Sequence, residues 1–175
     1  ERTRHNVGAD LVLELAKSLH TELKYESKFF GDTARVSIAG RDVRLLIPST
    51  FMNLSGKSIA ALARFYQIAP ENILVVHDEL DMDPGTVRFK KGGGHGGHNG
   101  LRDTIKSLGN NQDFARLRIG IGHPGQANLV SDYVLKKASP SDQQLIANSI
   151  DDALRHLPTA VEGQWEKAMT ALHSL

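Results

Sequence analysis

A loop of glycine, histidine and asparagine is the part of this sequence whose residue types point most directly to chemistry. The run Gly92-Gly-Gly-His95-Gly-Gly-His98-Asn99-Gly100 lies within residues 85–125, which hold eleven of the sixteen glycines. Glycine loses more conformational freedom on folding than any other residue, so a soluble domain seldom concentrates it where no other molecule must approach the backbone. The sequence therefore predicts a site at this loop, with imidazole and amide side chains on it.

The two histidines of this loop, His95 and His98, have a spacing that could place both imidazoles on one metal ion. Zinc hydrolases generally use three protein ligands, and an HxxH pair in flexible glycine lacks the helix that makes HExxH informative. The run matches neither GxxxxGK[ST] nor GxGxxG, and the chain has no cysteine. We expect no metal and no nucleotide cofactor, and any nucleophile should be oxygen or nitrogen.

Three further polar clusters each have a chemical and a plain structural interpretation. Thr3-Arg4-His5-Asn6 precedes a predicted helix, whose positive dipole end favours a neutral imidazole that can act as a general base; the alternative is a helix cap with an exposed histidine. His77-Asp78-Glu79-Leu80-Asp81 follows a predicted strand, where a carboxylate could orient a histidine or simply form a turn. In Phe51-Met52-Asn53-Leu54-Ser55-Gly56, the asparagine could bind a ligand or cap a helix.

Charge is unevenly distributed, although the net charge is only +1. Residues 84–120 hold seven basic residues and two acids, a segment charge of +5, whereas residues 71–83 hold five acids and no lysine or arginine. The basic segment could attract phosphate, or its charges could be ordinary solvated surface. No apolar run approaches the roughly 18 residues that span a bilayer, and the N-terminus lacks the apolar stretch of a secretory signal. We therefore expect no membrane partner and a cytoplasmic protein.

The elements that must position these clusters alternate between helical and strand patterns, which favours an α/β architecture. With 40% hydrophobic residues, residues 1–175 are expected to form one domain. A hairpin turn is predicted at Gly40-Arg41, between two strand-like runs. Helices are predicted over residues 11–23 and 59–66, and two more near the C-terminal end are separated at Pro158. Strands are predicted over residues 33–39, 43–47, 73–76 and 116–121.

Together the four clusters form an ordered set that resembles bacterial peptidyl-tRNA hydrolases. The resemblance covers essentially the whole chain, and the run Arg116-Leu-Arg118-Ile-Gly-Ile-Gly-His123-Pro-Gly125 extends it beyond the glycine loop. The glycine and histidine run is highly specific, whereas Thr3-Arg4-His5-Asn6 alone would count for little. The resemblance implies one α/β domain with a mixed, twisted β-sheet flanked by helices. It also implies a metal-independent esterase that cleaves the bond between a peptide and the terminal ribose of tRNA.

The resemblance assigns a role to each matching residue. His5 would activate water as a general base, and Asp78 would hold the imidazole in the correct tautomer and stabilise its charged form. Asn53 and Asn99 would position the water and the peptide backbone, because an amide offers donors and an acceptor without a charge to desolvate. The remaining substrate-binding residues would be Met52 and His98, which line the cleft, Gly96 and Gly97, which let the peptide approach, and Phe51.

For the tRNA, the resemblance points to Lys90 and Arg118 as contacts to phosphate near the acceptor stem and the CCA end. This agrees with the charge of the basic segment. The family often has a lysine shortly after the His-Pro-Gly turn, where this chain has Gln126 and Ala127, so we expect somewhat weaker phosphate binding. The family also suggests a monomer.

A larger departure lies at the start, where relatives carry a first strand and a Gly-Asn-Pro-Gly turn, with an asparagine and a tyrosine that reach the substrate. Neither is present in these 175 residues. A sheet without that strand would leave backbone donors and acceptors unpaired, so we expect these residues alone to be unstable and poorly active. Equal melting temperatures with and without a restored strand would contradict this expectation.

Two other classes of function stay open. A non-catalytic RNA-binding protein is one, because the fold implied here also resembles that of a plant organellar intron-splicing factor. The presence of His5, Asp78, Asn53 and Asn99 together favours the esterase, since phosphate binding needs none of them. A metal-dependent hydrolase is the other, and activity that survives a chelator would exclude it.

Overall fold

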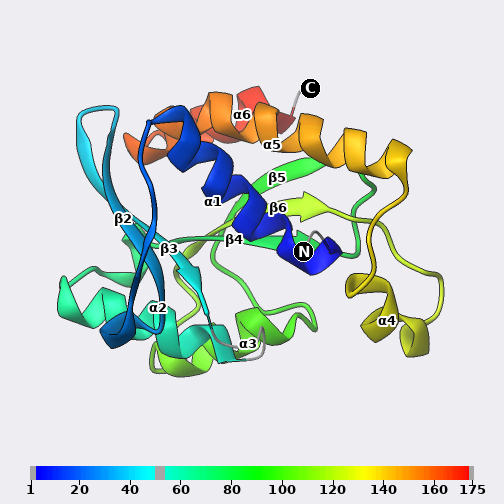
Figure 1. Cartoon of the computed structure of the whole chain (residues 1–175), viewed down its shortest axis with the longest axis horizontal. Coiled ribbons are helices and arrows are strands. Elements are labelled where there is room, and N and C mark those ends of the chain that lie inside the picture. Colours follow the sequence, from blue (N-terminus) through cyan, green and yellow to red (C-terminus); the bar gives the residue numbers. More distant parts are fainter. Residues whose placement is uncertain (1–2, 50–53, 174–175) are drawn as a thin grey trace.

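The computed structural model describes residues 3–49 and 54–173, with the backbone alone for His5. Helices and strands alternate along these residues, which confirms the α/β class (Figure 1). The α-helices are α1 (Val7–Ser18), α2 (Ser55–Phe65), α3 (Asn99–Ser107), α4 (Val130–Val134), α5 (Pro140–Val161) and α6 (Trp165–His173). The strands are β1 (Lys24–Glu26), β2 (Gly31–Ile38), β3 (Arg41–Pro48), β4 (Leu74–Glu79), β5 (Val87–Lys91) and β6 (Ala115–Gly120). Short 3-10 helices include η1 (Arg4–Asn6), η2 (Ser27–Phe29), η4 (Pro70–Asn72) and η5 (Ala127–Leu129).

The described strands form two three-stranded sheets. In the first, the order is β1-β2-β3 and all neighbours are antiparallel; in the second, the order is β4-β6-β5, with β4 parallel and β5 antiparallel to β6. The predicted β2–β3 hairpin is confirmed, and its turn residues Ala39 and Gly40 both have positive φ, 52° and 74°. The second sheet is mixed, as expected. Within the described residues, β3 and β4 are each an edge strand of their own sheet.

β6 is the central strand of the second sheet, and its side chains alternate between two environments. Leu117 and Ile119 are fully buried in the core formed with helices α1, α5 and α6. Successive side chains of a strand point to opposite faces, so Arg116 and Arg118 lie on the other face, toward α3 and the glycine loop. Within β6, apolar side chains therefore face the core and cationic side chains face the opposite way.

Helix α1 packs against both sheets and carries η1 at its start (Figure 1). Gly8 lies so close to the backbone of β4 that a β-carbon at this position would collide with the carbonyl group of Val76. One turn later, Leu11 is buried in the core of the second sheet, and Leu15 is buried with residues of β2 and β3. Each buried leucine contributes roughly 1.5–3 kcal/mol to folding. This packing fixes η1, and with it the backbone of His5, beside β4.

Several boundaries predicted from the sequence were wrong, and the first helix, predicted over residues 11–23, covers Val7–Ser18 instead. β4 pairs with β6 as far as Glu79 and Gly120, so His77, Asp78 and Glu79 lie within the strand rather than in a loop after it. Helix α5 continues through Pro158, and the chain turns instead at Gly163, where φ is 88°. Leu157 and Ala160 are buried on either side of the proline. Their packing holds the last turn against the core despite the hydrogen bond that proline cannot make.

Candidate active site

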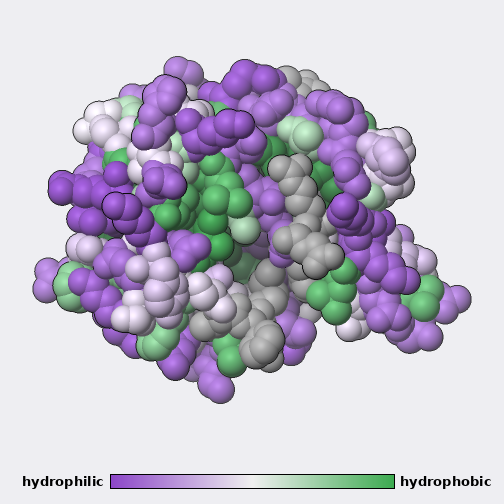
Figure 2. Space-filling model, in the orientation of Figure 1, coloured by the Kyte–Doolittle hydropathy of each residue, from purple (hydrophilic) through white to green (hydrophobic). Residues whose placement is uncertain are grey.

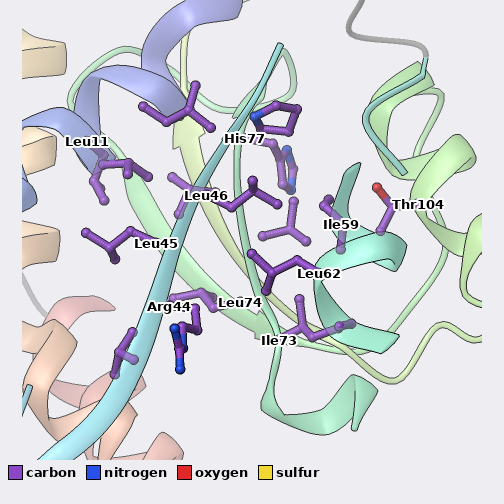
Figure 3. Close-up of a pocket in the computed structure, with 18 of the residues that line it drawn as sticks. Leu11, Arg44, Leu45, Leu46, Ile59, Leu62, Ile73, Leu74, His77 and Thr104 are labelled. Carbon is purple, nitrogen blue, oxygen red and sulfur yellow. The ribbon is translucent and has the colours of Figure 1, made fainter. Parts of the chain in front are cut away.

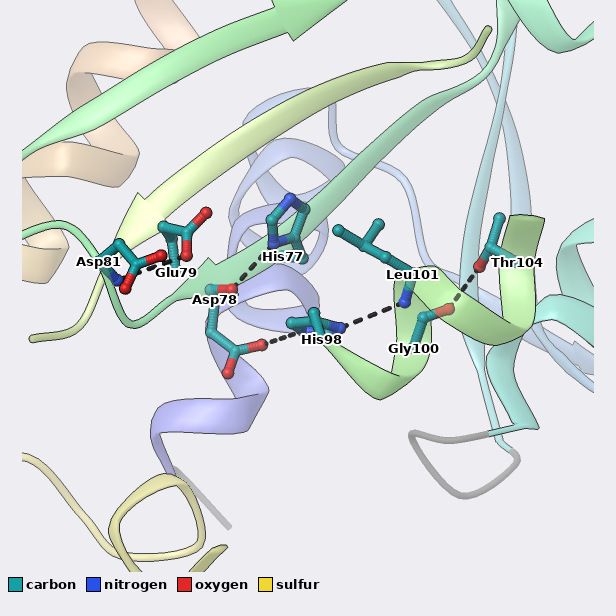
Figure 4. A network of polar contacts seen from close by, with 8 residues as sticks. All are labelled: His77, Asp78, Glu79, Asp81, His98, Gly100, Leu101 and Thr104. Carbon is teal, nitrogen blue, oxygen red and sulfur yellow. Dashed lines mark hydrogen bonds and ion pairs between the residues drawn. The ribbon is translucent and has the colours of Figure 1, made fainter. Parts of the chain in front are cut away.

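A buried carboxylate on β4 and an imidazole at the start of α3 form the centre of a polar network (Figure 4). Asp78 is only 3% exposed, and its Oδ1 atom accepts a hydrogen bond of 2.7 Å from Nε2 of His98. A buried carboxylate needs hydrogen-bond donors that stabilise its charge, and Nε2–H of His98 is one such donor. Two of the predicted site residues therefore lie together.

His98 is held at both ring nitrogens. It is the N-cap residue of α3, and its Nδ1 accepts a hydrogen bond of 3.2 Å from the backbone N–H of Leu101. A nitrogen that accepts carries no proton, so in the neutral ring the proton is on Nε2 and is donated to Asp78. The hydrogen bonds thus assign the tautomer and fix the ring plane. The sequence-based analysis had placed this residue only as a lining of the cleft.

His77, on the same strand, is buried and neutral. Its Nδ1 donates to the backbone carbonyl of Asp78 at 2.8 Å, and its ring contacts that of His98 edge to face, with centroids 5.1 Å apart. Burial, together with the nearby His98, lowers the pKa of His77 to about 4. Nε2 therefore carries a lone pair at neutral pH, and no other described atom donates to it. This is a buried hydrogen-bond acceptor without a described partner.

An apolar cavity of about 1020 Å³ lies between the edge strands β3 and β4. Figure 2 shows it as a hollow with hydrophobic residues inside, and Figure 3 shows side chains from α1, β3, β4 and α2 around it. His77 is at one end of this lining. The apolar lining includes Leu11, Leu45, Leu46, Ile59, Leu62 and Leu74.

The segment that carries His5 is clamped between β4 and α4. Nη1 of Arg4 donates to the carbonyl of Tyr133 at 2.8 Å, and the guanidinium carbon lies 3.7 Å from the centre of the Tyr133 ring. The Tyr133 hydroxyl donates in turn to the carbonyl of Ile121, at 2.6 Å, just after β6. Asn6 occupies the N-cap position of α1, but its side chain forms no capping hydrogen bond. The backbone beside Asp78 is thus fixed by contacts with two other elements.

The glycine loop has a backbone that only glycine adopts readily. Gly96 and Gly97 have φ of 56° and 83°, and a β-carbon on either would meet no other atom within 4 Å. Glycine is therefore required here by conformation, and the space above it is open. Within the loop, Nδ1 of His95 accepts the backbone N–H of Gly97 at 2.9 Å. Asn99 follows as the first residue of α3; it is exposed, and its Oδ1 accepts from Nη1 of Arg102 at 3.1 Å.

Cationic side chains lie opposite one another on β5 and β6. The register pairs Lys90 with Arg116 and Arg88 with Arg118. Like charges directly opposite in a sheet repel each other, so these pairs favour an anion bound over this face. Lys90 is exposed. Arg118 is partly neutralised, because its Nε donates to Oε1 of Glu79 at 3.1 Å.

The structure brings Asp78, His98 and Asn99 to one end of the second sheet, with Lys90 and Arg118 on the neighbouring strands. Phe51, Met52, Asn53 and the side chain of His5 lie outside the described residues. Sequence reasoning missed two buried residues, His77 and Arg116. For Arg116 the available signal was a basic residue at an alternating position of a predicted strand, and for His77 it was a histidine directly after one.

Neither a metal cluster nor a membrane span is found in the part of the chain that the structure describes. No three histidine, aspartate or glutamate side chains there come close enough to hold a metal ion. No helix in residues 3–49 and 54–173 is long and apolar enough to cross a membrane.

The sequence model of the family described as peptidyl-tRNA hydrolase matches residues 1–175. The peptidyl-tRNA hydrolase of Shewanella halifaxensis is 60% identical over 174 residues, covering 99% of this chain and 90% of the relative. That of Saccharophagus degradans is 60% identical over 178 residues, covering 99% and 88%. A crystal structure of peptidyl-tRNA hydrolase from Acinetobacter baumannii matches with a TM-score of 0.94 and 51% identity, covering 98% of this chain and 86% of that one.

Proposed function

This chain belongs to the peptidyl-tRNA hydrolase family, and on that premise we propose how its residues carry out the hydrolysis of peptidyl-tRNA. The family name describes an ester hydrolase. Water adds to the carboxyl carbon of the peptide, the bond to the ribose oxygen of the tRNA breaks, and peptide and tRNA are released. The protein must therefore remove a proton from water, hold the ester beside that water, and bind the tRNA.

We assign the removal of the proton to His5, which acts as the general base, with Asp78 as the carboxylate that orients it and stabilises its charged form. The observation that carries this assignment is the buried Asp78 carboxylate on β4, the strand that contacts the η1 segment containing His5. Burial strengthens the interaction of that carboxylate with an imidazolium ion, because little water screens it.

His98 supports Asp78 in this assignment. The N-cap contact to Leu101 sets the His98 tautomer, and the 2.7 Å hydrogen bond to Oδ1 then holds the carboxylate in one orientation. His98 therefore serves as a positioning residue for Asp78. Asn53 and Asn99 are proposed to hold the water and the peptide backbone through their amides, and the exposed position of Asn99 leaves it accessible to substrate.

The peptide and the tRNA approach from different sides of this network. Gly96 and Gly97 give the peptide access to the loop, where no side chain would block it, and Phe51 and Met52 are proposed to contact it. Lys90 and Arg118 are proposed to bind phosphates of the acceptor stem and CCA end. The opposed cations on β5 and β6 support this, since an anion relieves their repulsion.

Three further properties complete the proposal. Residues 1–175 form one domain, the active form is a monomer, and the protein works in the cytoplasm, where translation produces its substrate. We propose no metal and no cofactor, since base, carboxylate and amides account for each step of the ester hydrolysis.

The experiment that tests the proposed function is release of an N-acetylated amino acid from charged tRNA, with and without a chelator. The chain and its His5→Ala variant are compared, with His20→Ala, a histidine after α1, as the matched control. Turnover that resists the chelator and is lost only in His5→Ala is the expected result. Turnover lost with the chelator would indicate a metal-dependent hydrolase instead. Binding of tRNA without turnover, both in this chain and in a version with the first strand of the relatives added, would indicate a binding-only protein.

A further inference from the structure

The side chain of Arg116 occupies a place that its charge makes costly. It is 1% exposed, on the central strand β6, and no described carboxylate forms an ion pair with it. Burial, together with the nearby charge of Arg118, lowers its pKa. A buried charge without a counter-ion normally costs several kcal/mol, so an arginine at such a position needs strong compensating contacts.

Those contacts are carbonyl groups of the glycine loop and of the segment that precedes β6. Nη1 donates to the carbonyl of Gly94 at 2.8 Å, and Nη2 donates to those of Gly93 at 2.5 Å and Gln112 at 3.2 Å. The guanidinium carbon lies 4.1 Å from the centre of the Phe114 ring. A planar fork of donors can satisfy carbonyls in several directions at once, which the single ammonium of lysine cannot do.

The anchored stretch lies between two parts of the proposed site. On one side, the loop leads through His98 to Asp78, whose hydrogen bond depends on the start of α3. On the other side is Lys90, which the register places opposite Arg116. A β-carbon at Gly93 would lie 2.9 Å from the Cε and Nζ atoms of Lys90, so this glycine leaves room for the lysine chain.

We propose that Arg116 is a positioning residue for peptidyl-tRNA hydrolysis, with two separable effects. Its donor fork fixes the glycine loop, and through it the His98–Asp78 pair, which sets kcat. Its charge has no carboxylate partner among the described residues and adds to the field of Lys90 and Arg118, which sets KM for the tRNA. This inference rests on the proposed function and deepens it.

Two variants separate these effects. Arg116→Lys keeps the charge but loses the fork, so kcat should fall about tenfold, as expected for lost hydrogen bonds from a charged donor, while KM stays within about twofold. Arg116→Met loses both, so kcat should fall as far and KM should rise about fivefold, with a weaker dependence of KM on salt. The same changes at Arg35, an exposed residue of β2 paired with Asp42, are the matched controls and should leave both constants unchanged.

The measurement is steady-state hydrolysis of N-acetylaminoacyl-tRNA, with every protein assayed below its own melting midpoint. The same KM in the two variants, or a kcat for Arg116→Lys within about twofold of the parent chain, would overturn the inference. So would failure of Arg116→Lys to fold at any temperature, because the arginine would then be needed for folding alone. If the parent chain itself shows no turnover, the proposed function fails rather than the role of Arg116.

Discussion

The two sides of β4 treat buried polar groups in opposite ways. Toward the glycine loop, the Asp78 carboxylate, the His98 imidazole and both Nη atoms of Arg116 have hydrogen-bond partners, and Nε of Arg116 has no described one. Toward β3, the chain has an apolar cavity of about 1020 Å³, and Nε2 of His77 has no described donor. The first side therefore holds the fixed geometry that the proposed mechanism uses. The second side depends on apolar packing, and an unsatisfied acceptor there costs roughly 1–3 kcal/mol.

The largest effect on activity should come from substitution of Asp78, the carboxylate on the side toward the glycine loop. Asp78→Asn keeps the size of the side chain and an oxygen that can accept from His98, but it removes the negative charge that stabilises a protonated base. We expect kcat/KM to fall by a factor of about 10² to 10⁴, the range of general acid–base effects. Asp81→Asn, an exposed residue after the same strand, is the control. Near-normal turnover in Asp78→Asn, measured on N-acetylaminoacyl-tRNA, would remove Asp78 from the mechanism.

The next effect concerns stability on the cavity side. The pKa of His77 is about 4 in the folded chain and about 6.5 when unfolded, so between these values the unfolded state binds the extra proton. Stability is then full above about pH 6.5 and falls by about 3 kcal/mol as the pH drops to 4. Urea unfolding at several pH values, for the chain and for His77→Phe, measures this. Between pH 6.5 and 4, the free energy of unfolding should fall by about 3 kcal/mol less in the variant than in the parent chain. The same dependence of the free energy of unfolding on pH in both proteins would contradict a buried, neutral His77.

A smaller loss is expected at the residue that links the loop to β4. His98→Ala removes the N-cap of α3 and the donor to Asp78, so kcat should fall about tenfold to a hundredfold, since a hydrogen bond to a charged group is worth about 1.5–3 kcal/mol. His95 lies in the same loop, and its described side-chain hydrogen bond comes from the backbone N–H of Gly97, so His95→Ala should change kcat far less. If the two variants lost activity equally, the His98–Asp78 bond would have no special role.

The smallest effect concerns the cationic face. Glu79→Gln frees Arg118 from its partly exposed ion pair, so tRNA should bind about two- to threefold more tightly at low salt, in line with the modest energy of such pairs. The gain should shrink as salt is added. Glu71→Gln, outside this face, is the control. Weaker tRNA binding in Glu79→Gln, measured by filter binding across a salt series, would show that the ion pair instead holds Arg118 in its binding position.

The fold and the loop were predictable because their signals are local. Leu117 and Ile119 belong to a run of residues that is typical of a β-strand. The positive φ of Gly96 and Gly97 explains why glycine occupies these positions. The end of β4 was not predictable, since polar residues within a strand resemble a turn until the pairing partner is known. The same holds for Pro158. The helix continues through this proline because neighbouring residues are buried, and their burial is known only from the tertiary structure.

The network around Asp78 could be predicted only in part. The sequence shows which residues are chemically suitable, but the pairing of Asp78 with His98 depends on how β4 and α3 pack. Arg116 looked like one of several cations in a basic segment. Its burial, and its contacts with loop carbonyls, follow from the alternation of β6 and from the course of the loop above it.

The central claim is that a histidine base beside the Asp78 carboxylate drives the reaction, and the pH dependence of single-turnover hydrolysis tests it most directly. For the parent chain we predict a rate that rises with one proton's slope through the range where histidine titrates and then levels off. In Asp78→Asn this limb should move to lower pH, because the stabilising negative charge is gone, and in His5→Ala it should vanish. A limb of the same position and slope in His5→Ala would contradict the account.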